Sequence, residues 1–250
     1  MESRFTDHNL FELDGAHAAL TVYKFDANEE PQNGADFDWW IGNQATGWIG
    51  LRCQAKKLDD GAYAELGHTV RGERQYDVLL RESGAEGMWP LYCFYNGWDG
   101  GWPADVPNLA CPKGVAPVRL QEFGSKGCKH VAVEHFGCSL APAQLVRRRH
   151  RGSRHGRLAL ESYLAFSIPW SRLFAPAATS AGGGREGMTV IRSIEGYLSE
   201  LFETFDLADR GGHRQKRLPS WVVAIRRGDR AEAKYAQKPR ALAVLEVPVD

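Results

Sequence analysis

Four polar residues in the N-terminal half have the types and the spacing of a catalytic group. Asp36 and Asp38 are two residues apart, and so are Gln54 and Lys56. Side chains alternate between the two faces of a strand, so each pair shares a face if its segment is extended. A hairpin turn predicted at residues 43–47 makes the two segments antiparallel neighbours. All four polar groups are therefore expected on one side of a sheet.

This set of groups suits metal-assisted hydrolysis of a phosphodiester. Mg²⁺ prefers hard oxygen ligands, which Asp36 supplies as a carboxylate and Gln54 as a neutral amide. Lys56 would orient the attacking water or neutralise the charge that develops on the phosphate. The alternative is a strand whose polar face is simply solvated and has no chemical role.

The elements around these residues follow the order helix, strand, strand, strand, helix, strand. Thr6 or Asp7 can cap a first helix, which Asp14 and Gly15 end. β-Branched and aromatic runs predict strands at 18–25, 36–41, 48–56 and 89–95. Apolar residues at helical spacing predict the second helix from about 73 to 83.

This order and these motifs resemble the PD-(D/E)XK nucleases, whose fold is that of the restriction endonucleases. Gln54-Ala55-Lys56 is similar to the Gln-x-Lys variant of the Mrr-type enzymes. The closest resemblance is to an uncharacterised bacterial family predicted to have this fold, and it rests on the runs Gly34-Ala35-Asp36-Phe37-Asp38-Trp39-Trp40, Gln54-Ala55-Lys56-Lys57 and Pro90-Leu91-Tyr92-Cys93-Phe94-Tyr95-Asn96. The resemblance implies an α/β (α+β) fold, in which helices flank a central mixed sheet. It also implies Mg²⁺- or Mn²⁺-dependent cleavage of nucleic acid, often in defence against foreign DNA.

Carried over by motif, Asp36 matches the metal-binding aspartate, Gln54 the second acidic position and Lys56 the lysine. The proline that usually precedes the aspartate is replaced by Ala35, and glutamine in place of glutamate removes a negative charge. Another acid would compensate for that loss, and the candidates are Asp38, Glu30 and Glu12. Glu12 has a specific claim, because many members of this fold place a glutamate on the first helix. Gln75, on the second helix, is a candidate phosphate contact.

The chain is predicted to be one domain, 1–250, with a nuclease-like core at about 6–96 and an elaboration at 97–250. Residues 97–126 are rich in Gly and Pro and read as an excursion from the core. Beyond them the pattern predicts a strand at 130–136, helices at 141–151, 158–166 and 188–205, and a terminal antiparallel pair of strands at 221–226 and 241–247.

The chain has no net charge, but its two halves have opposite charges. Residues 1–125 contain 10 Lys and Arg against 19 Asp and Glu, whereas residues 126–250 contain 21 against 12. The densest positive run is predicted to contact phosphates, together with Lys57 and Gln75; its members are Arg147, Arg148, Arg149, Arg151 and Arg154. Two other interpretations stay open, namely a salt-bridged interface between the halves and a solvated helix end.

The cysteines argue against a disulfide framework. Their number is five, without a short Cys-x-x-Cys pair, and the first residues are too polar for a secretory signal, so a reducing cytoplasm is predicted. No apolar run is long enough to span a membrane. Cys128, His130, His135 and Cys138 are zinc-ligand types, but their spacing matches none of the common zinc motifs, which disfavours Zn²⁺.

The sequence therefore predicts a metal-dependent endonuclease that acts on nucleic acid; DNA is favoured as the substrate, and RNA stays open as the alternative. The resemblance adds a homodimer and a defence-system protein as candidate partners. Two non-enzymatic alternatives remain: a catalytically inactive nuclease fold that binds nucleic acid or a protein, and a zinc-stabilised interaction protein.

Overall fold

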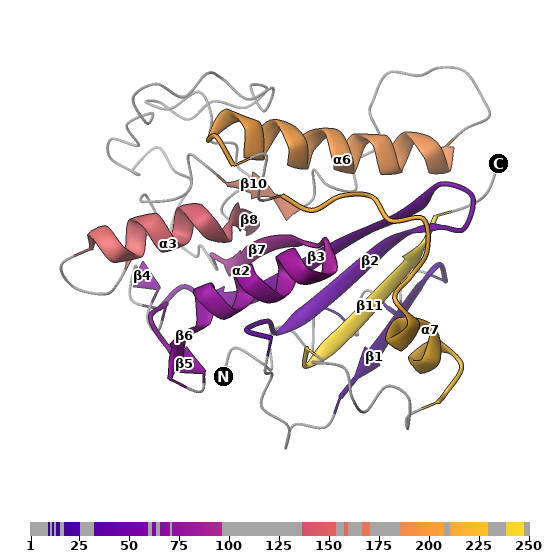
Figure 1. Ribbon diagram of the computed structural model, residues 1–250, viewed down its shortest axis with the longest axis horizontal. Helices are drawn as coiled ribbons and strands as arrows, with labels where there is room; N and C mark the ends of the chain where they lie inside the picture. Colours follow the sequence, from indigo (N-terminus) through magenta and orange to yellow (C-terminus); the bar gives the residue numbers. More distant parts are fainter. Residues whose placement is uncertain are drawn as a thin grey trace.

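A seven-stranded mixed sheet lies at the centre of the protein (Figure 1). The computed structural model describes residues 10, 12, 14–15, 18–25, 33–59, 62–63, 66–70, 72–96, 137–153, 158–159, 167–170, 186–207, 211–229 and 239–247. The order of strands across the sheet is β1-β11-β2-β3-β7-β8-β10. The strands are β1 (Leu20–Lys24), β2 (Phe37–Asn43), β3 (Gly47–Lys57), β7 (Trp89–Tyr95), β8 (Cys138–Pro142), β10 (Ile168–Pro169) and β11 (Ala241–Glu246).

Four helices flank this sheet in the described part of the chain: α2 (Gln75–Glu86), α3 (Ala143–Gly152), α6 (Glu186–Thr204) and α7 (Ser220–Arg226). Two pairs of short strands lie outside it, β4 (Ala62–Tyr63) with β9 (Leu158–Ala159) and β5 (Thr69–Val70) with β6 (Glu73–Arg74). The predicted fold class, a mixed α/β protein with helices around a central mixed sheet, is confirmed. Among the described helices, none is both long and apolar enough to cross a membrane.

The helices are divided between the two faces of the sheet by the alternation of side chains along the strands. Trp40 of β2 packs in one buried cluster with Trp221 and Val222 of α7. Trp89 of β7 points to the other face, where its ring lies 4.7 Å from that of Phe202 of α6, edge to face. Helices α2 and α3 lie side by side on the face that α7 covers (Figure 1), so α6 covers the opposite face.

The last strand of the chain lies inside the sheet rather than at its edge. β11 pairs antiparallel with β1 and parallel with β2, and the register places Ala241 opposite Phe37. Because the first residues of parallel strands lie at the same end of a sheet, Arg240 and Asp36 become neighbours. The C-terminal segment thus completes the end of the sheet at which the predicted catalytic residues stand.

The terminal antiparallel pair of strands predicted for the second half is wrong. Residues 221–226 form α7 and not a strand, so the terminal antiparallel pair does not exist, and β11 takes β1 as its antiparallel partner. Although its sequence is rich in β-branched residues, α7 buries four side chains at helical spacing, Trp221, Val222, Ala224 and Ile225. Packing on the sheet therefore outweighs local propensity. Of the helix predicted at 158–166, the structure describes only the first two residues, Leu158 and Ala159, which form β9 and pair with β4; the rest lies outside the described residues.

The remaining element predictions are confirmed wherever the structure describes them. The strands predicted at 18–25, 36–41, 48–56, 89–95 and 241–247 and the helices near 73–83, 141–151 and 188–205 are present with shifted ends. Leu10, Glu12, Asp14 and Gly15 have helical backbone, as the predicted first helix requires. The strand predicted at 130–136 lies outside the described residues.

Candidate active site at the end of β2 and β3

Asp36, just before β2, accepts hydrogen bonds from β3 across the sheet. Its Oδ2 accepts from Gln54 Nε2 at 2.5 Å and from the backbone N–H of Ala55 at 2.9 Å. Its own N–H donates to the carbonyl of Cys53 at 2.9 Å. The Asp36 side chain is 13% exposed, so it is held in place by the sheet while keeping contact with solvent.

Gly34 brings this aspartate close to α2. It has a positive φ of 74°, and a Cβ on it would lie 2.8 Å from the carbonyl oxygen of Gln75 and from the N–H of Leu79. Only glycine fits such an approach at this φ without strain. Asn33 supports the turn by accepting the N–H of Ala35 at 3.0 Å. The loop therefore sets Asp36 beside the start of α2.

Gln75, the first residue of α2, connects to Asp36 through Gln54. Gln75 Nε2 donates to Gln54 Oε1 at 2.6 Å, and Gln54 in turn presents its amide N–H₂ to Asp36. Gln75 Oε1 is buried and accepts no hydrogen bond from the described residues. We call Asp36, Gln54, Lys56 and Gln75 the Asp36 cluster; the sequence predicted a phosphate contact for Gln75 but not its bond to Gln54.

Lys56 and Tyr92 complete the surroundings of this cluster. Lys56 follows Gln54 by two residues on β3, so it points to the same face, and it is only 3% exposed. Tyr92 of β7 stands opposite Gln54 in the parallel register and is fully buried. Its hydroxyl has no hydrogen-bond partner among the described residues. Burial, with a contribution from nearby carboxylates, raises the pKa of Tyr92, so the phenol stays neutral.

Arg240 is a charged neighbour of Asp36 that the sequence analysis did not identify. Its Nε lies 3.9 Å from Asp36 Oδ1, and its side chain is 46% exposed. No local signal marks this residue, because its position depends on the parallel pairing of β11 with β2. The pairing of Tyr92 with Gln54 likewise depends on a parallel register, that of β3 with β7.

Asp38 lies in a different arrangement from Asp36, although the two residues share a face of the sheet. Its carboxylate accepts from Arg52, with Nε at 3.0 Å from Oδ1 and Nη2 at 2.7 Å from Oδ2. Both side chains are completely buried. Arg52 also donates to Glu86 Oε1 at 3.2 Å. We call Asp38, Arg52 and Glu86 the Asp38 cluster.

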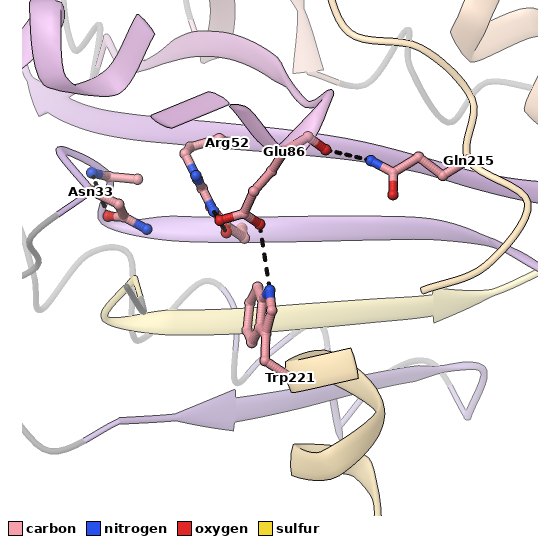
Figure 2. A network of polar contacts seen from close by, with 7 residues as sticks. Asn33, Arg52, Glu86, Gln215 and Trp221 are labelled. Atoms are coloured by element: carbon pink, nitrogen blue, oxygen red, sulfur yellow. Dashed lines mark hydrogen bonds and ion pairs between the residues drawn. The ribbon is translucent and has the colours of Figure 1, made fainter. Parts of the chain in front are cut away.

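Glu86 extends this cluster to the C-terminal half of the chain (Figure 2). Its Oε2 lies 3.4 Å from Trp221 Nε1 of α7, and its carbonyl accepts from Gln215 Nε2 at 2.5 Å. Figure 2 shows Glu86 between Arg52 on one side and Gln215 and Trp221 on the other. These bonds use both oxygens of each carboxylate, so the Asp38 cluster has a structural role: Asp38 joins β2 to β3 through Arg52, and Glu86 joins them to α2 and α7.

Burial and charge oppose each other in the Asp38–Arg52 pair. Burial raises the pKa of Asp38, and the adjacent guanidinium acts against that rise. Burial would lower the pKa of Arg52, but the carboxylates of Asp38 and Glu86 outweigh burial and raise it. Arg52 therefore stays charged, and its loss would leave a buried carboxylate without a counter-ion.

The other predicted metal ligands do not meet at Asp36 in the described part of the chain. Glu12 is exposed, and Glu30 lies outside the described residues. Within the described ranges, no group of three or more His, Cys, Asp or Glu side chains could hold a metal ion. Asp36 is thus the acid that the structure places beside Gln54. Of the zinc-type residues, only Cys138 is described; its Sγ lies 3.3 Å from that of Cys93.

Part of the arginine run pairs with the acidic half of the chain. On α3, Arg147 Nη1 lies 3.0 Å from Asp77 Oδ1 and Arg151 Nη2 lies 2.9 Å from Asp77 Oδ2. Arg151 also stands 5.6 Å from the centre of the Tyr76 ring. These bonds hold α3 against the first turn of α2, next to Gln75. Arg148 and Arg149 are exposed, Lys57 is half-buried at the end of β3, and Arg154 lies outside the described residues.

Comparison with known proteins identifies a family but no characterised relative. No curated protein and no solved structure matches the chain. A family model matches residues 1–245, nearly the whole sequence, and its description is that of a family of unknown function, DUF6615. The chain therefore belongs to the DUF6615 family.

Proposed function

We propose that this protein is a metal-dependent nuclease that hydrolyses phosphodiester bonds of DNA at the Asp36 cluster. The observation that supports the proposal best is a partly buried carboxylate, a buried amide and a buried lysine on one face of the sheet, where β2 begins and β3 ends. Buried polar groups are costly unless they are satisfied or serve a function. Here two buried oxygens, Gln75 Oε1 and the Tyr92 hydroxyl, have no partner among the described residues.

The donor set suits Mg²⁺ or Mn²⁺ with water completing the coordination shell. Mg²⁺ in proteins is commonly held by one or two carboxylates and keeps several water molecules. Asp36 would hold it through its carboxylate, whose Oδ1 lies 3.9 Å from Arg240 Nε. Gln54 would hold it through its amide oxygen, which in the structure accepts from Gln75 instead. The Gln54 amide must therefore turn over when it binds a metal.

Gln75 can accommodate that turn. If both amides turn over, the N–H₂ group of Gln54 points at Gln75. Gln75 Oε1, which has no partner among the described residues before the turn, then accepts a hydrogen bond from that group. The bound metal would polarise the phosphate and lower the pKa of a bound water molecule. Lys56, which is buried on the same face, would offset the negative charge that develops on the phosphate. Arg148 and Arg149 on the neighbouring α3 would contact the DNA backbone.

The decisive experiment is cleavage of plasmid DNA with Mg²⁺ or Mn²⁺ by the wild-type protein, with EDTA as a control. Lys56→Ala should abolish cleavage while leaving the fold and DNA binding largely intact. Lys24→Ala, which removes an exposed lysine at the end of β1, is the matched control and should cleave normally. Retained cleavage by Lys56→Ala would exclude the proposed mechanism.

A second candidate function is a nuclease fold that binds nucleic acid or a protein partner without cleaving. Its supporting observation is the bond from Gln54 Nε2 to Asp36 Oδ2, which satisfies the carboxylate without a metal. Calorimetric titration with Mn²⁺ separates the two candidates. Binding that disappears in Asp36→Ala favours the nuclease, whereas a folded wild-type protein that binds no Mn²⁺ favours the binding module.

For the cellular setting, we infer a reducing cytoplasm and a role in defence against foreign DNA. The described cysteines Cys53, Cys93 and Cys138 are free thiols, which suits a reducing compartment. Burial raises the pKa of Cys53 and Cys93 well above the ordinary value, so neither thiol is suited to act as a nucleophile. Thiol chemistry therefore does not compete with hydrolysis as the function of this region.

A further inference from the structure

A groove of about 860 Å³ opens at the other end of the β2–β3 hairpin from Asp36. Four cationic side chains line it, Lys216, Arg217, Arg226 and Arg227, together with the polar Asn43 and Gln44. All four cations belong to exposed residues. We call this feature the basic groove. None of these four cations belongs to the arginine run singled out from the sequence.

The cations come from two segments that the fold holds in place. Lys216 and Arg217 stand on the connector between α6 and α7, whose Gln215 forms a two-bond bridge with Trp48 at 2.7 and 2.8 Å. Arg226 and Arg227 stand at the end of α7. Further upstream in the connector, a Cβ on Gly212 would come within 2.6 Å of the Trp89 backbone nitrogen.

This close packing fixes the backbone that carries the charges. A ligand that binds to fixed cations orders less of the protein than one that binds a flexible basic tail, so less affinity is lost.

Few acids balance these cations. One acidic residue, Glu246, belongs to the described lining of the groove, and it forms an ion pair with Arg226. The other three cations have no carboxylate within the lining. The groove therefore carries a surplus of positive charge, and field lines from a concave surface concentrate in its interior.

We propose that the basic groove binds the phosphodiester backbone of a nucleic acid. Several cations along a concave path match a chain of regularly spaced phosphates, whereas a flat bilayer would touch only the rim. The exposed Gln44 adds a neutral amide, a group that commonly contacts phosphate oxygens beside Arg and Lys. The Asn43 amide is buried and bonds to Val247 and to the turn. Apolar residues such as Leu218 and Val223 also line the groove and are partly buried, so the four cations and Gln44 supply its exposed hydrogen-bonding groups.

The groove deepens the proposed nuclease function but can be tested separately from it. β2 spans the distance between Asp36 and the groove, on the order of 20 Å for a seven-residue strand. A nucleic acid seated in the groove would need several base pairs to reach the Asp36 cluster. If the protein does not cleave DNA, the basic groove can still bind nucleic acid. The duplex-binding measurement, and not the cleavage assay, therefore tests this inference.

The test is the binding of a short fluorescent DNA duplex, measured by anisotropy over a series of NaCl concentrations. All variants are made in an Asp36→Ala background with EDTA, so that cleavage cannot interfere. K216E/R217E should weaken binding by about tenfold or more and reduce the slope of log affinity against log salt by about 2. K216Q/R217Q should show a smaller loss in the same direction. The matched control is R81E/R192E, which makes the same charge change on exposed parts of α2 and α6.

Three outcomes would overturn the inference. One is a wild-type protein that binds no duplex, and another is an equal loss in R81E/R192E, which would mean that only total charge matters. The third is groove-dependent binding to phosphatidylglycerol vesicles or to a polyglutamate peptide while duplex binding is unaffected by K216E/R217E. Circular dichroism of every variant shows whether a loss of binding reflects unfolding. If K216E/R217E unfolds, the glutamine pair provides the decisive measurement.

Discussion

Asp36 and Asp38 occupy the same face of the same strand region, two residues apart, yet the fold uses them differently. Asp38 is fully buried and gives both oxygens to Arg52, which Glu86 also contacts. Asp36 remains 13% exposed, and its cluster contains amide groups that can exchange partners. The Asp38 cluster uses both oxygens of its two carboxylates and joins elements, whereas the Asp36 cluster keeps the access and the adaptable donors that a binding site needs.

The largest expected difference between the two aspartates is in activity. Asp36→Ala should lower Mg²⁺-dependent cleavage by about 10³-fold or more, because it removes the proposed metal carboxylate. Asp38→Ala should change the rate per folded molecule by less than about tenfold, since Asp38 serves the fold. Plasmid cleavage is measured at a temperature where circular dichroism shows both variants folded. Equal loss in the two variants would mean that Asp38 belongs to the catalytic site after all.

Stability should show the reverse order. Asp38→Ala leaves the buried Arg52 guanidinium without its main partner and should cost about 3–5 kcal/mol of unfolding free energy. Asp36→Ala removes the acceptor of one amide N–H and one backbone N–H, at a cost of about 1–2 kcal/mol. Urea unfolding followed by tryptophan fluorescence gives both values. The double variant Asp38→Leu/Arg52→Leu should recover much of the loss, because it removes both charges together.

A smaller effect is expected from restoring the missing charge of the Asp36 cluster. Gln54→Glu places a second carboxylate beside Asp36, so Mn²⁺ should bind about tenfold or more tightly by calorimetry. Gln75 can still donate its N–H₂ group to the new carboxylate, which keeps the link to α2. Asp38→Glu is the control within the other cluster and should leave Mn²⁺ affinity unchanged. Affinity that does not rise in Gln54→Glu would remove Gln54 from the proposed ligand set.

The smallest effect concerns the buried Tyr92 hydroxyl at the edge of the Asp36 cluster. Burial raises the pKa of Tyr92, so above its ordinary value of 10.0 the unfolded chain loses this proton while the folded protein keeps it. The unfolded state then binds fewer protons, and stability falls as the pH rises. Tyr92→Phe should make this alkaline decline shallower by up to about 1.4 kcal/mol per pH unit.

At neutral pH the same substitution should cost less than about 1 kcal/mol, because the hydroxyl has no hydrogen-bond partner in the described structure. Urea unfolding at neutral and alkaline pH provides the measurement. A large loss of stability at neutral pH would show that the hydroxyl has an important partner.

The sequence by itself determined the parts of this site that depend on local pattern. Alternation along two strands placed Asp36, Gln54 and Lys56 on one face, and the turn at 43–47 paired the strands. The same pattern did not show that Asp36 and Asp38 have different roles. That difference depends on the pairing of Asp38 with Arg52, and on Glu86, which α2 brings to Arg52. Nor did the pattern distinguish a strand from a helix at 221–226. The β-branched residues there favour a strand, whereas packing on the sheet imposes the helix α7.

Only the tertiary structure decided which distant residues join the site. The parallel insertion of β11 beside β2 brings Arg240 to Asp36, and the parallel register of β3 and β7 brings Tyr92 to Gln54. The basic groove likewise needs the connector at Trp48 and the end of α7 together. The physical reason is that periodicity fixes the face on which a side chain lies, whereas pairing between remote segments is chosen by the burial of the whole sheet.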